Sequence, residues 1–504
     1  MKKGFVYLVG AGPGRTDLIT VRGAEVLSKA DCVIYDKLAN PALLRYARSD
    51  AEIIAVPKRI GKGSATQEQI NNLLVEKAAG GLMVVRLKGG DPCIFGRVAE
   101  ELTVLNEAGV GFEIVPGVTA GIAVSSYAGI MLTDRDYSSQ VLFITGHEAE
   151  GRQQSSIDWP VLAKFGGTLV FYMGVGNLDS IAGRLVENGK PAETPVALIA
   201  NVTFPTQRIV RGTLGDIEEK RIQSKLEPPA IIVIGETAGS DAGFDWFEKK
   251  PLFGKTIVIT RDAAGNADSA LKIIERGGNP VEFPTLKIRP LTQSNEFLRA
   301  LTKLAQNDWI IFTSANGVTI FFKAINGMGK DARIFGQAKI AAIGERTAAR
   351  LGEFGIKADF VPTVFTGEQL GIQLSGFADL RGEKVLLLRS QLASEELVEL
   401  LTQAEAEVEN VALYTADMEK GDSALLTEQL EHGEIDWLTF ASPSSVDGFF
   451  EQIPCKMVQS NKVRIASVGP VTSERLKQIG IDVDVEATEH TIDGLLDAIE
   501  ASGI

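Results

Sequence analysis

Short apolar runs alternate with amphipathic stretches of helical period between Val6 and Glu236. The runs are VYLVG, CVIYD, MVVRLKGG, VLFITG, TLVFYMG, PVALIA and AIIVIGE. Strands read as continuous apolar runs when helices cover both faces of a parallel sheet. The pattern therefore predicts an α/β fold of strands and crossover helices.

After AIIVIGE, the sequence from Thr237 to Gly243 consists of small and polar residues and includes two glycines, which interrupt helices and strands. This composition predicts a linker that ends near Pro251. We expect a first domain over 1–245, a linker over 246–253 and a second domain over 254–504.

The second part of the chain contains an internal repeat. GKTIVITR at position 254 returns as GEKVLLLR at 382, and DWIIFTSANGVTIFF at 308 returns as DWLTFASPSSVDGFF at 436. KIAAIGERTAARLGEFGI at 339 returns as RIASVGPVTSERLKQIGI at 464. Three blocks in one order at nearly one offset predict two similar α/β lobes, and the cleft between two lobes is a usual ligand site.

Composition restricts the chemistry. A chain of 504 residues requires two or more domains, and its net charge of −14 argues against a nucleic-acid binder. No apolar run reaches the roughly 18 residues of a membrane span, so we expect a cytoplasmic protein. The three cysteines and three histidines show no metal-ligand spacing, so we expect no metal. Catalysis is left to carboxylates, amines, hydroxyls or an organic cofactor.

The glycine loop VGAGPGRTD after the first apolar run invites a dinucleotide interpretation. Gly10 and Gly12 fit the G-x-G-x-x-G pattern, and Asp36 could serve as its acidic residue. Arg15 replaces the third glycine, and Pro13 removes an amide donor. A glycine turn that lets the backbone approach a ligand is favoured over a dinucleotide loop.

Several motifs in order carry a family resemblance. They are VVRLKGGDPCIFGRVAEE from Val84, VPGVTAGIA from Val115, GIMLTDRDY from Gly129 and LVFYMG from Leu169. Over roughly residues 4–245 the chain resembles the tetrapyrrole methylase family, and within it the uroporphyrinogen-III C-methyltransferases. The resemblance implies a two-lobed α/β domain that binds S-adenosyl-L-methionine and releases S-adenosyl-L-homocysteine.

The resemblance also implies the site residues of this first domain. Cofactor contacts, largely through backbone groups, are implied at Pro13, Gly89, Gly90, Asp91, Ile94, Thr119, Ala120, Met173 and Val202. Asp36 and Lys58 match a proton acceptor and donor, and Arg97 with Glu100 matches an alternative base system. Lys37 and Arg135 match basic residues that face substrate carboxylates.

Structural interpretations of the same residues stay open. Asp36 and Lys58 could form a surface ion pair, and Arg97 could form a helical salt bridge with Glu101 four residues later. Some positions also depart from the family pattern: Gly63 and Asp134 stand where histidine is common, Val98-Ala99 where two glycines are common, and Val202 where a glycine is expected. These departures affect the site assignments more than the family.

The second half resembles uroporphyrinogen-III synthase through GKTIVITR, DWIIFTSANGV, AAIGERTA, FVPTVFTGEQL, VLLLRS and EHTIDGLLDAI. The resemblance implies one lobe over about 254–287 plus 414–504 and another over about 288–413, joined by TLKIRP and VALYTAD as a hinge. Tyr414 matches the tyrosine implicated in assisting the leaving group; the alternative is a packed hinge aromatic. Substrate-binding turns are expected at Ser314, Asn316, Ser442, Ser444 and Thr472, each of which could equally be an N-cap.

Together these resemblances suggest a bifunctional enzyme of tetrapyrrole biosynthesis. It would close hydroxymethylbilane to uroporphyrinogen III and methylate that product at C2 and C7 to precorrin-2, for siroheme or cobalamin. Its partners would be these tetrapyrroles, without nucleic acid or membrane, and the resemblance allows a homodimer through the first domain. The alternatives are a methyltransferase fused to a noncatalytic tetrapyrrole-binding module, or a methyltransferase of a later precorrin.

Overall fold

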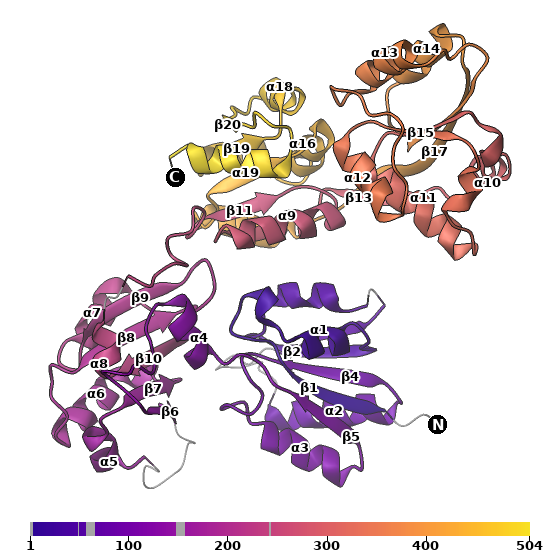
Figure 1. The fold of residues 1–504 in the computed structure, drawn as a ribbon. Helices are drawn as coiled ribbons and strands as arrows, with labels where there is room; N and C mark the ends of the chain where they lie inside the picture. Colours follow the sequence, from indigo (N-terminus) through magenta and orange to yellow (C-terminus); the bar gives the residue numbers. More distant parts are fainter. Residues whose placement is uncertain (1–3, 49, 57–65, 148–156, 241–242, 504) are drawn as a thin grey trace. The chain divides into compact units, whose positions relative to one another are not determined.

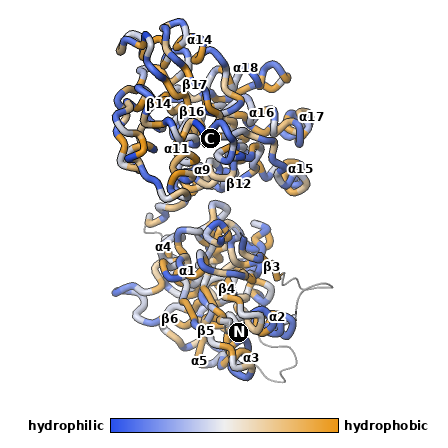
Figure 2. Tube along the Cα trace, turned by 90° about the vertical axis from the view of Figure 1, so that its right-hand side faces the viewer, coloured by the Kyte–Doolittle hydropathy of each residue, from blue (hydrophilic) through white to orange (hydrophobic). Residues whose placement is uncertain are grey.

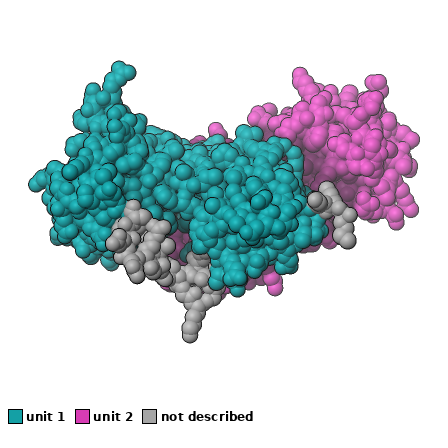
Figure 3. Space-filling view, turned by 90° about the horizontal axis from the view of Figure 1, so that it is seen from below, with its two compact units in different colours: residues 1–256, 272–279 teal, residues 257–271, 280–504 magenta. Residues whose placement is uncertain are grey.

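The computed structural model describes residues 4–48, 50–56, 66–147, 157–240 and 243–503. Two compact units emerge, residues 1–256 with 272–279 and residues 257–271 with 280–504 (Figure 3). Each unit contains two five-stranded sheets with helices around them (Figure 1). The predicted α/β class is confirmed, and the predicted domain boundaries stay predictions.

The first sheet is entirely parallel, with strand order β3-β2-β4-β1-β5. Its strands are β1 (Phe5–Gly10), β2 (Cys32–Asp36), β3 (Glu52–Val56), β4 (Met83–Lys88) and β5 (Gly111–Val115). Helix α1 (Val21–Leu27) lies on one face, and α2 (Gln67–Ala79) and α3 (Val98–Glu107) lie on the other (Figure 1). The carboxyl ends of all five strands therefore meet at one edge, where α/β proteins bind ligands.

The second sheet is mixed, with strand order β6-β7-β10-β8-β9. Its strands are β6 (Val141–Thr145), β7 (Thr168–Tyr172), β8 (Pro195–Ala200), β9 (Arg208–Thr213) and β10 (Ala230–Ile234). Its helices are α4 (Ala120–Tyr127), α5 (Trp159–Lys164), α6 (Leu178–Glu187), α7 (Ile217–Ser224) and α8 (Glu236–Gly239).

All seven apolar runs form strands of the first unit. Its three other strands, β3, β5 and β9, do not correspond to any of these runs. These three lie at sheet edges, where one side of the strand faces solvent, so their sequences EIIAV, GFEIV and RIVRGT mix polar and apolar positions. Figure 2 shows hydrophilic and hydrophobic positions interleaved along the trace as a whole. A run of apolar letters therefore detected the central strands and the apolar edge strand β6, and it overlooked the three edge strands of mixed composition.

The predicted linker contains residues that pack. Phe247 and Leu252 are fully buried, and the Trp246 indole nitrogen donates to the carbonyl oxygen of Ser126 over 2.6 Å. Trp246 and Phe247 also make ring contacts with Tyr127, with centroids 5.2 and 5.0 Å away. The segment after Gly243 is thus packed against the first unit.

The second unit holds the third sheet, β12-β11-β18-β19-β20, and the fourth, β13-β17-β16-β14-β15. The strands are β11 (Thr256–Ile259), β12 (Asn279–Glu282), β13 (Leu286–Pro290), β14 (Trp309–Phe312), β15 (Lys339–Ala342), β16 (Lys384–Ser390), β17 (Glu407–Met418), β18 (Trp437–Phe440), β19 (Arg464–Ser467) and β20 (Val485–Glu486). The helices are α9 (Ala263–Glu275), α10 (Asn295–Thr302), α11 (Ala315–Gly327), α12 (Glu345–Glu353), α13 (Gly367–Phe377), α14 (Glu396–Gln403), α15 (Ser423–Glu431), α16 (Pro443–Phe450), α17 (Cys455–Ser460), α18 (Pro470–Gln478) and α19 (Ile492–Ala501).

The sequence repeat is also a repeat of contacts. Asp359 accepts a hydrogen bond from the backbone of Ile340 over 2.7 Å, and Asp484 accepts one from Ile465 over the same distance. The two predicted hinge segments lie on β13 and β17, which pair antiparallel with Pro290 opposite Tyr414. Two similar lobes joined by two extended segments are therefore present.

Candidate functional site

The carboxyl ends of β1, β4 and β5 meet in a glycine junction formed by Gly10, Gly12, Gly89, Gly90 and Gly117. Gly12 and Gly90 exchange two backbone hydrogen bonds of 3.2 and 2.8 Å. A Cβ on Gly117 would lie 2.3 Å from the Gly90 carbonyl oxygen, and one on Gly10 would lie 2.6 Å from the Gly117 Cα. Only glycine allows this approach, and it leaves bare backbone for a ligand.

Asp91 stabilises this junction with its side chain. One carboxylate oxygen accepts from the Gly117 amide over 2.9 Å, and the other accepts from the Cys93 amide over 2.8 Å. The carboxylate thus joins the loop after β4 to the loop after β5. A cofactor contact of Asp91 would then fall to its backbone.

An apolar wall adjoins the glycine junction. The predicted cofactor residues Ile94, Ala120 and Val202 pack into one hydrophobic cluster that also contains Tyr172. The Tyr172 hydroxyl hydrogen-bonds the Thr119 hydroxyl and accepts from the Gly121 amide, each over 2.9 Å. Burial raises the pKa of Tyr172, so this phenol stays protonated.

The backbone near this wall is strained. Eight described non-glycine residues have positive φ, and five of them follow β4, β7 or β8: Phe95, Arg97, Met173, Asn201 and Thr203. Strained conformations concentrate at functional sites, because only a site that needs them retains their cost. The strain therefore supports a site in these loops, where Met173 was expected and is half exposed.

Asp36 ends β2 beside the glycine junction. A Cβ on Gly89 would lie 2.6 Å from the Cβ of Leu38, so the segment after Asp36 contacts the loop after β4. The Asp36 carboxylate accepts a hydrogen bond from the Arg86 guanidinium over 3.2 Å and one from the Leu38 amide over 3.3 Å. The Asp36 side chain is 13% exposed, and because Lys58 lies outside the described residues, the alternative of an ion pair between the two stays a prediction.

Behind Asp36 lies a charged cluster that the sequence interpretation missed. Arg86 and Lys88 on β4 both contact Glu101 on α3, and Arg86 also contacts Asp36. The signal was present in the sequence, because MVVRLK has charged residues at alternate positions, which share one face of a strand.

The remaining predicted residues of the first unit are placed as follows. Arg97 pairs with Glu100 over 2.7 Å at the start of α3, and both side chains are about half exposed. The proposed salt bridge from Arg97 to Glu101 is therefore wrong. Lys37 and Arg135 are exposed, and Pro13 is half-buried. Lys58 and Gly63 lie outside the described residues.

Asp134 has a local structural use. Its carboxylate accepts from the amides of Asp136 and Tyr137 over 2.8 and 3.2 Å, and its backbone exchanges two hydrogen bonds with Ser138. The carboxylate thus forms the turn that carries Arg135, which explains an aspartate at this position.

In the second unit, Tyr414 and Ser314 meet at the carboxyl end of the fourth sheet. Their hydroxyls lie 2.9 Å apart, and the Ser314 hydroxyl also accepts from the Gly317 amide over 2.9 Å as the N-cap of α11. Tyr414 is 9% exposed. The tyrosine is held in one orientation with its hydroxyl at a helix N-terminus.

The other predicted turn residues differ in exposure. Asn316 and Ser444 are exposed, and Ser442 caps α16 by accepting from the Ser445 amide over 3.2 Å. Thr472 is 3% exposed, so it presents almost no surface to a substrate.

Two arginines of the second unit were not expected at a site. Burial, and next the neighbouring charge of Arg346 on α12, lower the pKa of Arg261, which follows β11. The Arg261 Nη1 donates to the Gly265 carbonyl oxygen over 3.2 Å and to the Ser269 hydroxyl over 3.1 Å.

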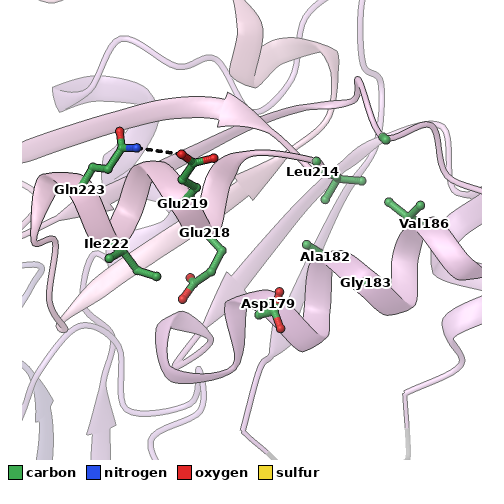
Figure 4. A pocket seen from close by; sticks show the side chains of 11 residues that line it. Asp179, Ala182, Gly183, Val186, Leu214, Glu218, Glu219, Ile222 and Gln223 are labelled. Carbon is green, nitrogen blue, oxygen red and sulfur yellow. Dashed lines mark hydrogen bonds between the residues drawn. The ribbon is translucent and has the colours of Figure 1, made fainter.

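A separate pocket of about 550 Å³ lies between α6 and α7 (Figure 4). Its lining includes Asp179, Val186, Leu214, Glu218 and Ile222. None of the expected site residues lines it, and its acidic rim would repel a polyanionic substrate. We therefore place the candidate site at the strand ends.

Two further properties concern only the part of the chain that the structure describes. No group of three or more histidine, cysteine, aspartate or glutamate side chains is arranged to hold a metal ion. None of the described helices combines the length and apolar character needed to cross a bilayer.

Comparison with known families assigns both halves. The profile of the tetrapyrrole (corrin/porphyrin) methylases matches residues 6–218, and that of uroporphyrinogen-III synthase HemD matches residues 268–497. Both families are enzymes, so the chain joins an S-adenosylmethionine-dependent tetrapyrrole methyltransferase domain to a uroporphyrinogen-III synthase domain.

Relatives extend this assignment to the whole chain. The porphyrin biosynthesis protein HemD of Ruminiclostridium josui is 38% identical over 99% of this chain and 98% of its own length. The uroporphyrinogen-III C-methyltransferase of Bacillus subtilis is 41% identical over 70% of this chain and 72% of its own. The siroheme synthase of Zymomonas mobilis is 47% identical over 49% of this chain and 52% of its own length. The chain belongs to the family of two-part porphyrin biosynthesis proteins represented by the first of these relatives.

Proposed function

We propose that this chain catalyses two successive reactions of tetrapyrrole biosynthesis. The second domain closes hydroxymethylbilane and inverts its last ring to give uroporphyrinogen III. The first domain then methylates this product at C2 and C7 to give precorrin-2. The observation that carries the proposal is the presence of both families on one chain, because the expected product of one domain is the expected substrate of the other.

The glycine junction fits the proposed cofactor. The bare backbone of Gly89 and Gly90, with the apolar wall of Ile94 and Ala120, would hold S-adenosylmethionine where a Cβ would exclude it. Bound there, the sulfonium supplies an electrophilic methyl group. The protein has to orient the acceptor pyrrole carbon and to receive the N–H proton that the ring loses.

Asp36 is our proposed proton acceptor. Its carboxylate is largely buried and is fixed by Arg86 and by the Leu38 amide, as a positioned base requires. Glu100 is half exposed and engaged by Arg97, an arrangement that suits substrate contact at the rim of the site. Lys37 and Arg135, both exposed, would contact substrate carboxylates.

The second domain needs no strong base, because hydroxide leaves easily from a hydroxymethyl group beside a pyrrole. The Tyr414 hydroxyl, held by Ser314, would donate a hydrogen bond to the departing oxygen. The exposed Arg346 is a further candidate to pair with a substrate carboxylate.

Relatives named as siroheme synthases support siroheme as the destination of the product, and cobalamin is the second candidate. A noncatalytic second domain is the alternative to the synthase activity. A methyltransferase of a later precorrin is the alternative to the first activity.

Assays of the two half-reactions on the full chain separate these alternatives. With supplied uroporphyrinogen III and S-adenosylmethionine, we expect a dimethylated product, and Asp36→Asn should lower kcat at least about 100-fold. A larger loss in Glu100→Gln than in Asp36→Asn would assign the base to Glu100 instead. With hydroxymethylbilane alone, the type III isomer should form; spontaneous type I closure would mean that the second domain only binds.

A further inference from the structure

The charged cluster behind Asp36 joins strands β2 and β4 of the first sheet to helix α3. The Arg86 guanidinium contacts Asp36 Oδ2 and Glu101 Oε1, each over 3.2 Å, and the Lys88 ammonium donates to Glu101 Oε2 over 2.8 Å. Arg86 and Glu101 are fully buried, and Lys88 is 3% exposed. These are among the most buried charges in the described chain.

The four charges cancel, since two cations face two carboxylates. Burial, together with the neighbouring charge of Arg86, lowers the pKa of Lys88, and the adjacent Glu101 carboxylate opposes this shift without cancelling it. Apolar side chains of similar volume often stabilise a core as well as such a cluster does. A use other than stability is therefore expected for charges placed at this depth.

Successive hydrogen bonds connect Gln67 and Lys88, through Glu101 and Arg86, to the Asp36 carboxylate. Gln67 on α2 and Lys88 both donate to Glu101. Glu101 accepts from Arg86 Nε, and the Ile34 and Leu87 carbonyl oxygens accept from Arg86 Nη1, which leaves Nη2 directed at Asp36. The guanidinium has no freedom to turn away from the carboxylate.

We propose that Arg86 is a positioning residue for the proton acceptor Asp36, and that Glu101 and Lys88 hold Arg86 in the required orientation. This inference rests on the proposed role of Asp36. When the methylated pyrrole loses its N–H proton, the N–H bond breaks and an O–H bond forms on the Asp36 carboxylate. A fixed guanidinium on Oδ2 keeps Oδ1, which among the described residues accepts only the long hydrogen bond from the Leu38 amide, aimed at the substrate nitrogen throughout the step.

Arg86→Lys tests the inference, because it keeps the charge balance of the cluster and removes the fork that reaches Asp36 and Glu101 together. In the full-length enzyme with supplied uroporphyrinogen III, we expect kcat to fall at least about tenfold, with KM for both substrates within about twofold. Arg48→Lys is the matched control: Arg48 pairs with Asp31 and Asp50 at the surface of the same sheet, and kcat should not change.

A double-mutant cycle separates positioning from a general loss of structure. If Arg86 acts through Asp36, Arg86→Lys should change kcat by less than about twofold in an Asp36→Asn background. An equal loss in both backgrounds would overturn the inference, as would an unchanged kcat in Arg86→Lys alone. If Asp36→Asn itself retains full kcat, the proposed role of Asp36 fails instead.

Folding of each variant is measured by its binding stoichiometry for S-adenosylhomocysteine and its thermal transition. If Arg86→Lys does not fold, the charge-balanced double variant Glu101→Gln with Lys88→Met replaces it in the cycle. It removes one carboxylate and one ammonium together, so the net charge of the cluster stays zero while Arg86 loses its ion pair with the Glu101 carboxylate. We expect kcat at least about threefold lower, again only when Asp36 is present.

Discussion

The glycine junction gives the sharpest structural prediction, the effect of Gly117→Ala. The new Cβ would lie 2.3 Å from the Gly90 carbonyl oxygen, whereas real Cβ contacts stay above 3.0 Å, so the backbones must separate by about 0.7 Å. The obstacle is the backbone of Gly90, in the loop after β4, and of Gly10, at the end of β1, which no rotamer change relieves. The shift would also stretch the hydrogen bond from the Gly117 amide to Asp91.

Overpacking of this kind costs about 1–3 kcal/mol. For a domain of this size, 1 kcal/mol lowers the Tm by roughly 2–4 °C, so the methyltransferase transition should fall by roughly 2–12 °C. The displaced Gly90 backbone should weaken S-adenosylhomocysteine binding at least about tenfold, because the proposed cofactor contacts depend on that position.

Calorimetry measures both effects on the full chain, by scanning for the Tm and by titration for the Kd. Gly183→Ala is the matched control: Gly183 lies within α6 with open space at its Cβ, so alanine should stabilise the helix by up to about 1 kcal/mol and leave the Kd unchanged. An unchanged Tm and Kd in Gly117→Ala would refute the close approach of the strands and the placement of the cofactor on them.

Three further predictions concern the two sites. Tyr414→Phe should slow formation of the type III isomer and leave methylation of supplied uroporphyrinogen III intact; equal loss of both activities would indicate misfolding. Ser314→Ala should lower synthase activity as well as stability, whereas Ser294→Ala, which removes only the N-cap of α10, should cost about 1 kcal/mol without lowering synthase activity. S-adenosylhomocysteine at about 100 times its Kd should stabilise only the methyltransferase transition, by about 2.7 kcal/mol; a matching shift of the synthase transition would contradict separate sites.

The sequence predicted the central strands and the repeat because both are local patterns. The runs VYLVG and AIIVIGE lie in strands buried on both faces, and the repeat places Trp309 and Trp437 on equivalent strands. The edge strands β3, β5 and β9 were overlooked because their half-exposed sequences contain no continuous apolar run, whereas the edge strand β6 contains one and was detected. Local patterns thus predicted the fold class and left the sheet edges undetermined.

The candidate site was only partly predictable for a similar reason. The motifs located the loops after β1, β4 and β7, but the pairing of Arg86 with Asp36 joins residues 50 positions apart. The four-residue spacing of a helix offered a salt bridge from Arg97 to Glu101 as the structural alternative to the Arg97–Glu100 pair. Arg97 has a left-handed conformation before α3 begins, so that spacing does not apply to it.

The most direct test of the two-reaction proposal is a single anaerobic assay with the purified chain, hydroxymethylbilane and S-adenosylmethionine. Products are separated by isomer and by the number of methyl groups added. The proposal predicts a dimethylated type III product. Recovery of unmethylated type I macrocycle, formed by spontaneous closure, would contradict the proposed synthase activity, and unmethylated type III product would contradict the proposed methylation.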